Sequence, residues 1–314
     1  MIDTKYHNEE IDLAKLVRSI VAEWKTILFF FTVSVIASVI YAIKSPDIYT
    51  STAMVIAAPT PTATQNLEIP GKLGSVASLI GLNGDKSNDN LMLALAMLKS
   101  WEFVEFFISK RGIGPQIYAS TSWDKDTDTL VYDASSYDAK EKKWIHSSRS
   151  ISPTNPAPSS WYIYKIFEDS LGISTDTKSG IIRISISHYS PKLAQKWVDW
   201  IIQDINQHLK KEEIEDTKRR IDFLKNEIEK NKITQIDRMF NSLIEEQTKI
   251  LMLAEATDEF VLKTVSKSKV PVEKSGPDRI LIITIGIICG LALSFVFIYM
   301  KNFIFRSENS DNGL

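Results

Sequence analysis

The sequence predicts a membrane-anchored α/β domain that carries a long extended helix, folded back as a helical hairpin. Two apolar segments without charged residues, 26–43 and 280–300, lie near the two ends of a chain of 314 residues. Between them, β-branched stretches alternate with helix-like stretches, which is typical of an α/β domain. Residues 192–257 contain neither Gly nor Pro, so a long helical region is expected there.

The charge balance and the cysteine content exclude several classes of protein. The chain has 37 Lys and Arg against 39 Asp and Glu, a formal net charge of −2, whereas a dedicated nucleic-acid binder has a strongly basic domain or stripe. The single cysteine, Cys289, excludes an intrachain disulfide and a cysteine-based zinc site. We therefore expect no nucleic-acid partner.

Both apolar segments are long enough to cross a bilayer as helices. Residues 26–43 would extend about 27 Å and residues 280–300 about 32 Å, against a hydrocarbon core of about 30 Å. Aromatic rings favour the headgroup region, and the edges of the segments carry Trp24, Tyr41 and Tyr299. A cleaved signal peptide fits the first segment less well, because the preceding arm holds more acidic than basic side chains. A buried core helix fits the second less well, because charged residues bound it on both sides.

The two segments divide the chain into five parts. An arm of residues 1–25 precedes the first predicted helix (26–43), and a tail of residues 301–314 follows the second (280–300). Two crossings put the arm and the tail on one side of the membrane and residues 44–279 on the other. Lys and Arg are about equally frequent near the helix ends on both sides, so they do not indicate the orientation. Short arms around a large domain are typical of a bacterial inner membrane protein with cytoplasmic termini and a periplasmic domain.

Strand and helix patterns alternate in the central domain. Residues 48–57 are rich in β-branched side chains, and residues 180–188 alternate isoleucine with polar residues, as a half-buried strand does. A last strand is expected over residues 260–265. Two helices are predicted, from Asn88 or Asp89 to a stop at Gly112 and over residues 161–171.

The polar segment 113–160 contains three alternating aspartates, Asp124, Asp126 and Asp128. Such a row suggests a calcium loop or the cation site of a sugar-nucleotide enzyme. A calcium loop needs Gly at its sixth position, where this chain has Thr129. We therefore predict a solvent-exposed turn here in preference to a metal site.

The long helical region 192–257 is expected to fold back on itself. As one helix it would be about 100 Å long, which is more than a domain of this size can cover. Thr234, with Asp237 three residues later, resembles a capping box and marks the expected point of return. Before this point a narrow seam of the coiled-coil kind is formed by Ile214, Ile221, Leu224 and Ile228. The seam packs within one subunit, against neighbouring subunits, or both, and the sequence leaves these alternatives open.

Small residues recur at a spacing of four on both apolar segments. Gly286 and Gly290 share one face of the second predicted helix, and Ser34 and Ser38, with Ala42, form a matching row on the first. Such rows let two helices approach closely in a membrane. The same spacing is also common by chance in such helices, so packing and routine composition both stay open.

The sequence lacks the residue patterns that the common classes of enzyme need. The glycine-rich stretch 70–85 has no G-K-[ST], which a phosphate-binding loop requires. The four histidines show no metal-ligand spacing, and no nucleophile with an adjacent base is recognisable. We therefore expect no catalytic residues, no cofactor, no metal and no enzymatic activity.

The order and spacing of these features resemble the Wzz family of polysaccharide co-polymerases, the chain-length determinants of lipopolysaccharide O-antigen. The resemblance rests on EEIDLAKLVRSIVAEWK before the first helix, IYTSTAMVIAAP after it, and LALAMLKSWEFVEFFI. It continues in DTKSGIIRISISHYSPKLAQKWVDWIIQDIN, LIEEQTKILMLAEATDEFVLKTV and VPVEKSGPDRILI. It covers nearly the whole chain and is weakest over residues 113–160.

The resemblance implies a membrane-proximal α/β domain with a long helix, assembled side by side into a closed homo-oligomer. It implies no catalytic residues. Members of the family are expected to set the modal number of repeat units that a separate membrane polymerase adds. The implied partners are therefore further copies of the chain, the O-antigen polymerase, the growing lipid-linked polysaccharide and the lipid bilayer.

Three other functions stay open at this point. A co-polymerase for capsule or exopolysaccharide would work with a separate tyrosine autokinase, because residues 301–314 are too short for a fused kinase and contain no tyrosine. A sensor would need a cytoplasmic signalling module, for which neither terminal arm has room. A glycosyltransferase or hydrolase has only the alternating aspartates in its favour.

Overall fold

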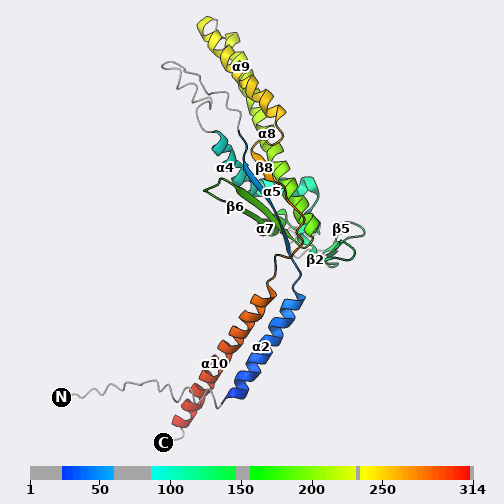
Figure 1. Ribbon diagram of the computed structural model, residues 1–314, viewed down its shortest axis with the longest axis vertical. Helices are drawn as coiled ribbons and strands as arrows, with labels where there is room; N and C mark the ends of the chain where they lie inside the picture. The colour runs from blue at the N-terminus through cyan, green and yellow to red at the C-terminus, as the bar shows by residue number, and fades with distance from the viewer. Residues whose placement is uncertain (1–22, 60–85, 146–155, 231–233, 312–314) are drawn as a thin grey trace, which may run out of the picture. The chain divides into compact units, whose positions relative to one another are not determined.

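The computed structural model describes residues 23–59, 86–145, 156–230 and 234–311 (Figure 1). The chain divides into two compact units. One unit combines the amino-terminal part, up to Pro46, with the carboxy-terminal part, from Gly276 onward. The other unit is the central part of the chain, from Asp47 to Ser275.

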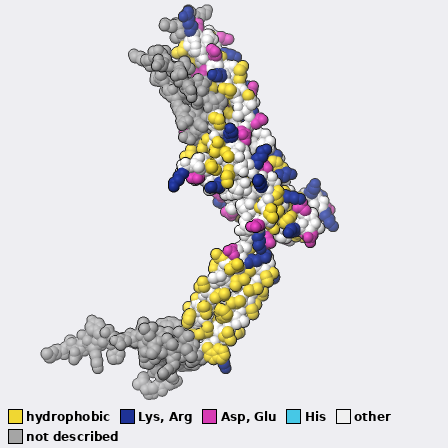
Figure 2. All heavy atoms as spheres, in the orientation of Figure 1, with side chains coloured by type: hydrophobic (Ala, Val, Ile, Leu, Met, Phe, Trp, Pro, Cys, Tyr) yellow, Lys and Arg dark blue, Asp and Glu magenta, His cyan; other side chains and the backbone are white. Residues whose placement is uncertain are grey.

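The first unit is a pair of helices that pack against each other, α2 (Trp24–Lys44) and α10 (Arg279–Asp311). Both are long and apolar enough to cross a membrane, α10 over Arg279–Ile298. Figure 2 shows hydrophobic side chains covering the surface of this pair. A soluble helix turns its apolar stripe inward, whereas here Phe29 is 64% exposed and Ile288 is 60% exposed. This outward apolar surface is what a helix in lipid requires.

The second unit is built on a four-stranded antiparallel sheet with the order β6-β7-β1-β8. Its strands are β1 (Tyr49–Ala57), β6 (Leu171–Thr175), β7 (Ile182–His188) and β8 (Leu262–Ser266). One face is buried, because side chains alternate along a strand: Ile184 and Ile186 are fully buried and Arg183 is exposed. The three strands predicted from the sequence are present, and β6 is the one that no sequence pattern indicated.

Helices cover the apolar face of this sheet. The long helix α8 (Pro191–Lys230) packs across β1 and β7, α4 (Lys86–Leu98) contacts β1, and α7 (Ser160–Ser170) contacts β6 and β7 (Figure 1). The largest buried side chain, Trp197, comes from the first turns of α8 and joins the isoleucines of β7 in one core. The amino-terminal half of α8 is therefore fixed by the sheet.

The single helix expected between Asn88 and Gly112 is in fact two helices, α4 and α5 (Trp101–Arg111). Ser100 has an extended backbone between them, and its hydroxyl accepts a hydrogen bond from the amide of Phe103 at 3.3 Å. Serine is a favourable N-cap, so it starts a new helix in a stretch that has no Gly or Pro to mark the break. The predicted stop is confirmed, since Gly112 has the left-handed φ of 63° that ends α5.

The polar segment after Gly112 has regular structure that the sequence pattern did not indicate. Its elements are α6 (Gly114–Tyr118) and two small hairpins, β2 (Ser120–Asp124) with β3 (Thr129–Tyr132), and β4 (Tyr137–Asp138) with β5 (Lys143–Trp144). Aromatic contacts hold these elements, with the rings of Tyr137 and Trp144 5.2 Å apart. The strands β4 and β5, of two residues each, are too short to show a periodic pattern.

The helical region folds back as predicted. α8 ends at Lys230 and α9 (Thr234–Ala256) begins at Thr234, which is the expected point of return. The two helices lie side by side along a common direction (Figure 1). With 40 residues α8 is about 60 Å long, so its second half extends past the sheet and packs along α9.

Candidate functional site in the helix pair and the helical hairpin

The predicted rows of small residues meet where α2 and α10 cross. A Cβ atom added at Gly286 would lie 2.4 Å from the Cβ atom of Ser38, and one added at Gly290 would lie 2.8 Å from that of Ser34. Both distances are shorter than real Cβ contacts. The Ser34 hydroxyl also donates a hydrogen bond to the Gly286 carbonyl at 2.7 Å. The crossing therefore requires glycine at both positions of α10.

Other contacts extend this crossing along both helices. Ala42 on α2 is 2% exposed, and Ser294 and Ile298 on α10 are at most 4% exposed. The rings of Phe30 and Phe297 pack with their centroids 5.0 Å apart. Lipid tails are as apolar as the helices, so close packing and hydrogen bonds between helices must supply the association. The effect of this crossing on the length of a polysaccharide stays a prediction.

The seam residues of α8 lie at two depths in the hairpin. Ile221 and Leu224 are 7% and 2% exposed, and Leu224 packs with Leu243, Phe240 and Ile244 of α9. The structure thus places the centre of the seam against α9 of the same chain. Ile214 and Ile228 are only half-buried, and Ile214 packs on the core of the sheet. Whether seam residues also contact a neighbouring subunit stays a prediction.

A polar layer that was not predicted from the sequence interrupts the seam. Thr217 is fully buried and Gln247 is 1% exposed. Arg220 connects them, since its guanidinium donates to the Gln247 side chain at 2.9 Å, to Thr217 at 2.8 Å and to Glu213 at 2.7 Å. Thr217 lies three residues after Ile214 and four before Ile221, a core position of the heptad pattern. A polar residue at such a position fixes the register of paired helices.

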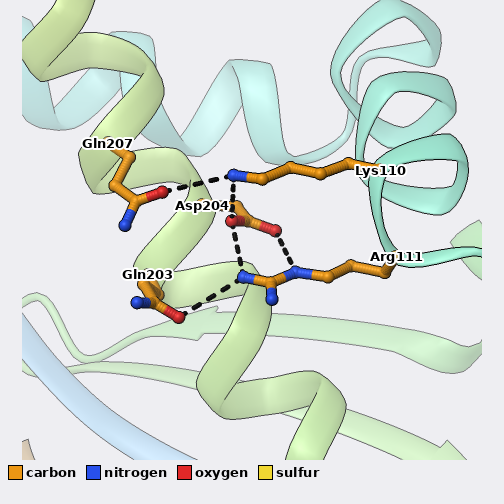
Figure 3. A network of polar contacts seen from close by, with 5 residues as sticks. All are labelled: Lys110, Arg111, Gln203, Asp204 and Gln207. Atoms are coloured by element: carbon orange, nitrogen blue, oxygen red, sulfur yellow. Dashed lines mark hydrogen bonds and ion pairs between the residues drawn. The ribbon is translucent and has the colours of Figure 1, made fainter.

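A buried ion cluster ties α5 to α8 (Figure 3). Asp204 is fully buried, and one of its oxygens accepts from the Lys110 ammonium at 2.8 Å and from the Arg111 guanidinium at 2.7 Å. Its other oxygen accepts from Nε of Arg111 at 2.8 Å. Gln207 and Gln203 also accept from the two cations, at 3.2 and 3.3 Å. This two-pronged contact fixes the end of α5 against α8.

Removing the carboxylate of this cluster should destabilise the central unit. We expect Asp204→Ala to lower the free energy of unfolding of the full chain by about 3 kcal/mol, because Lys110 and Arg111 lose their common partner. Asp204→Asn keeps an acceptor and should cost less. Denaturant unfolding in detergent, followed by circular dichroism, measures both. Asp216→Ala, which removes an exposed ion pair on the same helix, is the control with a cost below about 1 kcal/mol. Equal costs for Asp204→Ala and the control would contradict the cluster's role.

A buried histidine joins three elements at the base of α8. His188, at the end of β7, is 7% exposed, and its ring lies 4.5 Å from that of Trp197. Its Nδ1 accepts from the amide of Ser190 at 3.1 Å, so its Nε2 carries the proton and donates to the carbonyl of Gln116 at 3.2 Å. Burial lowers the pKa of His188, and its hydrogen bonds with Gln116 and Ser190 oppose this in part. The ring is therefore neutral at neutral pH.

This histidine should make the stability of the protein depend on pH. The unfolded chain keeps a histidine pKa of about 6.5, so it binds more protons than the folded chain once the pH falls below that value. The free energy of unfolding should have its full value above about pH 6.5. It should decrease as the pH falls below this value toward the pKa of His188 in the folded chain, which is lower. The difference between the free energies of unfolding at pH 7.5 and pH 5 should be smaller for His188→Gln than for the wild type. His208→Gln is the matched control, and an unchanged difference in His188→Gln would contradict this assignment.

The alternating aspartates serve the turn between β2 and β3. Asp124 accepts from the amide of Asp126 and the hydroxyl of Thr127, at 2.9 and 2.8 Å, and the Thr127 hydroxyl is the main cause of its lowered pKa. Asp128 pairs with Lys192, which lowers its pKa, and accepts from the indole of Trp123. Over the part of the chain that the structure describes, no three His, Cys, Asp or Glu side chains gather as metal ligands.

Two open grooves border α8. The larger, of about 970 Å³, lies between α8 and the segment Asp258–Lys267, and the smaller, of about 440 Å³, lies beside Phe106 and Lys110 of α5. The polar lining of the larger groove contains three amide side chains, four cations and four carboxylates. The amides are Gln203, Asn206 and Gln207, the cations Lys210, Lys211, Lys218 and Lys267, and the carboxylates Asp199, Glu215, Asp258 and Glu259. The charges of this lining balance, and Ile202 and Ile214 add apolar side chains to it.

Comparison with known proteins connects the amino-terminal part of the chain to one family. Residues 9–98 match the family model of Wzz, described as chain length determinant protein. A comparison with curated proteins finds no match.

Two solved structures are similar to the chain at low identity. One is a full-length bacterial polysaccharide co-polymerase, at 13% identity with a TM-score of 0.39, covering 94% of this chain and 99% of the other. The other is a fragment of WzzB, a polysaccharide co-polymerase from Salmonella Typhimurium, at 12% identity with a TM-score of 0.31, covering 74% and 100%. The family model matches the sequence of this chain directly. The resemblance of this chain to the Wzz family of polysaccharide co-polymerases is therefore confirmed over residues 9–98.

Proposed function

We propose that the protein regulates the length of a polysaccharide, namely the modal chain length of lipopolysaccharide O-antigen, as a scaffold without enzymatic activity. The observation that carries this proposal is the match of residues 9–98 to a chain length determinant family. The frame of the chain supports it, because two apolar helices flank one large unit with a long hairpin. Such a scaffold can hold or release a growing chain beside a polymerase, and so change when elongation stops.

The proposal includes a location. The protein resides in the bacterial inner membrane, with α2 and α10 crossing the bilayer, both termini in the cytoplasm and residues 44–279 in the periplasm. Alkaline phosphatase is active only where its disulfides form, which is the periplasm. A fusion after Ala157 should therefore be active and a fusion after Asn309 inactive. The reverse pattern of activities would contradict this topology.

The proposal also names partners. The protein acts as a closed homo-oligomer, beside the membrane O-antigen polymerase, on the growing lipid-linked polysaccharide, and it needs no cofactor. The hairpin offers apolar side chains for contacts between subunits, since Phe223 on α8 is 62% exposed and Met252 on α9 is 63% exposed. Subunits joined along their hairpins would present one repeated surface to the polysaccharide.

A deletion strain tests the function. Without the protein, the lipopolysaccharide ladder on a gel should lose its modal cluster but still contain long chains, and the wild-type chain should restore the cluster. Replacing Asp124, Asp126 and Asp128 together by Asn should leave the cluster in place, because the contacts of Asp124 and Asp128 are those of a structural turn. Loss of all polymer in this triple variant, at normal protein level, would contradict a non-enzymatic role. A change in capsule or exopolysaccharide with an unchanged ladder would favour the co-polymerase that works with a tyrosine autokinase.

A further inference from the structure

Two tryptophans form an exposed corner on the surface of the central unit. Trp101, the first residue of α5, and Trp161, in the first turn of α7, meet nearly perpendicularly, with centroids 5.5 Å apart and an interplanar angle of 76°. They are 45% and 42% exposed. A large part of both rings is therefore exposed to solvent and is not buried in the core of the unit.

A buried tyrosine, Tyr164, supports this corner. Tyr164 is 7% exposed, its ring lies 5.4 Å from that of Trp161, and its hydroxyl donates to the carbonyl of Lys99 at 3.0 Å. Lys99 directly precedes the N-cap of α5, so this bond links α7 to the start of α5. The helices that carry the two tryptophans are thus joined directly beneath them.

Polar groups border the corner. The Lys165 ammonium lies 5.4 Å from the centre of the Trp161 ring and forms an ion pair with Glu168 at 2.7 Å, and both side chains are partly exposed. Within the residues that the structure describes, neither the Trp101 nor the Trp161 indole N–H has a hydrogen-bond acceptor. Apolar ring surface therefore lies next to donors and an acceptor that can bind a ligand.

We propose that this tryptophan pair binds sugar rings of the polysaccharide. A pyranose ring has an apolar C–H face and a rim of hydroxyl groups, and the corner offers the matching surfaces. An aromatic ring covers the C–H face, while an indole N–H, the Lys165 ammonium and the Glu168 carboxylate reach the hydroxyls. The inference deepens the proposed function, on which it rests, by naming one surface that contacts the chain.

The size of the pair favours a saccharide over a second copy of the protein. At their exposed fractions the two indoles offer on the order of 100 Å² each. A stable interface between proteins buries about 800 Å² on each partner. Lys165 and its partner Glu168 also place charged groups beside the Trp161 ring. One or two sugar rings cover what is exposed.

Saturation-transfer NMR on the full-length protein in detergent tests the inference. The probe is the polysaccharide of the parent strain, released by mild acid and fractionated to short chains. The wild type should transfer saturation to its ring protons, and Trp101→Ala with Trp161→Ala should weaken binding about tenfold or more. The double change to Phe should retain part of the binding. Phe106→Ala, which removes an aromatic ring of similar exposure (41%) from α5, should leave it unchanged.

The outcomes of this experiment test the saccharide site independently of the proposed role in chain-length regulation. Loss of binding in the alanine variant, with unchanged oligomeric mass and melting temperature, supports a saccharide site. Absence of binding by the wild type, or full binding by the alanine variant, overturns it. A changed oligomeric mass also overturns it, because the pair would then be a contact between subunits. In the last three cases the ladder of the complemented deletion strain still shows whether the proposed function holds.

Discussion

Replacing Gly286 and Gly290 by leucine is expected to separate α2 from α10 and to abolish the modal cluster of the polysaccharide ladder. At both positions a Cβ atom alone would come within 2.8 Å of a serine side chain on α2, and leucine adds three further carbon atoms to each. Close packing at these positions is a main source of the association between the two helices, so the new side chains must move one helix away from the other. The Ser34 hydrogen bond to the Gly286 carbonyl would be lost in the same step.

The separation can be measured by a crosslink within the chain. Cysteines at Phe30 and Phe297, whose rings are in contact, should form an intrachain disulfide under copper phenanthroline in a Cys289→Ser background. The two leucines should prevent it. Ile288→Phe, which adds bulk at a 60% exposed position of α10, is the control that should not.

A size exchange gives the sharpest form of this prediction. Gly286→Ala should already weaken the crossing, since its Cβ would meet the Ser38 Cβ at 2.4 Å. Gly286→Ala with Ser38→Gly should restore it, because the next atom, the carbonyl oxygen of Ser34, is 3.6 Å away. If the exchange does not restore the crosslink and the ladder, the fit between these two side chains is not what joins the helices.

Local and periodic features of this chain are readable from its sequence. The strand β7 shows its alternation of isoleucines, Gly112 ends α5, and Thr234 starts α9, because each depends on a few neighbouring residues. Spacing also puts Ser34 with Ser38, and Gly286 with Gly290, on one face of each helix, whereas the contact between the two rows is known from the structure. A helix has a fixed repeat, so residues four apart share a face wherever the helix is placed.

Features that depend on distant contacts are not readable in this way. Asp204 is one of many acidic residues on α8, and only the fold brings the end of α5 to it. Trp101 and Trp161 lie 60 residues apart, so no local pattern links them. The polar layer of the hairpin differs from these two cases, because the sequence contained a pattern that indicated it. Thr217 occupies a core position of the heptad that the seam defines, and a polar residue there indicates a buried partner.

Substitutions at two neighbouring residues of α8 should distinguish the stability of the hairpin from its contacts with other subunits. Leu224 is 2% exposed and packs with Leu243 of α9, whereas Phe223 is 62% exposed. The same change to Asp therefore has different consequences at adjacent positions. Leu224→Asp loses the buried leucine and places a carboxylate without a partner between two helices, which should cost at least about 4 kcal/mol.

Hydrogen exchange and crosslinking together measure this pair of variants. Leu224→Asp should lose amide protection over Pro191–Lys230 and Thr234–Ala256, mainly beyond the part of α8 that the sheet holds. Phe223→Asp should keep that protection, since a change at an exposed site costs about 0.5 kcal/mol or less. If hairpins join the subunits, as proposed, Phe223→Asp should still reduce crosslinked oligomers and broaden the ladder. An intact oligomer and an unchanged ladder in Phe223→Asp would remove this face of α8 from the subunit contact. The protein would then have to assemble through another surface, because the buried side of the seam is already occupied by α9.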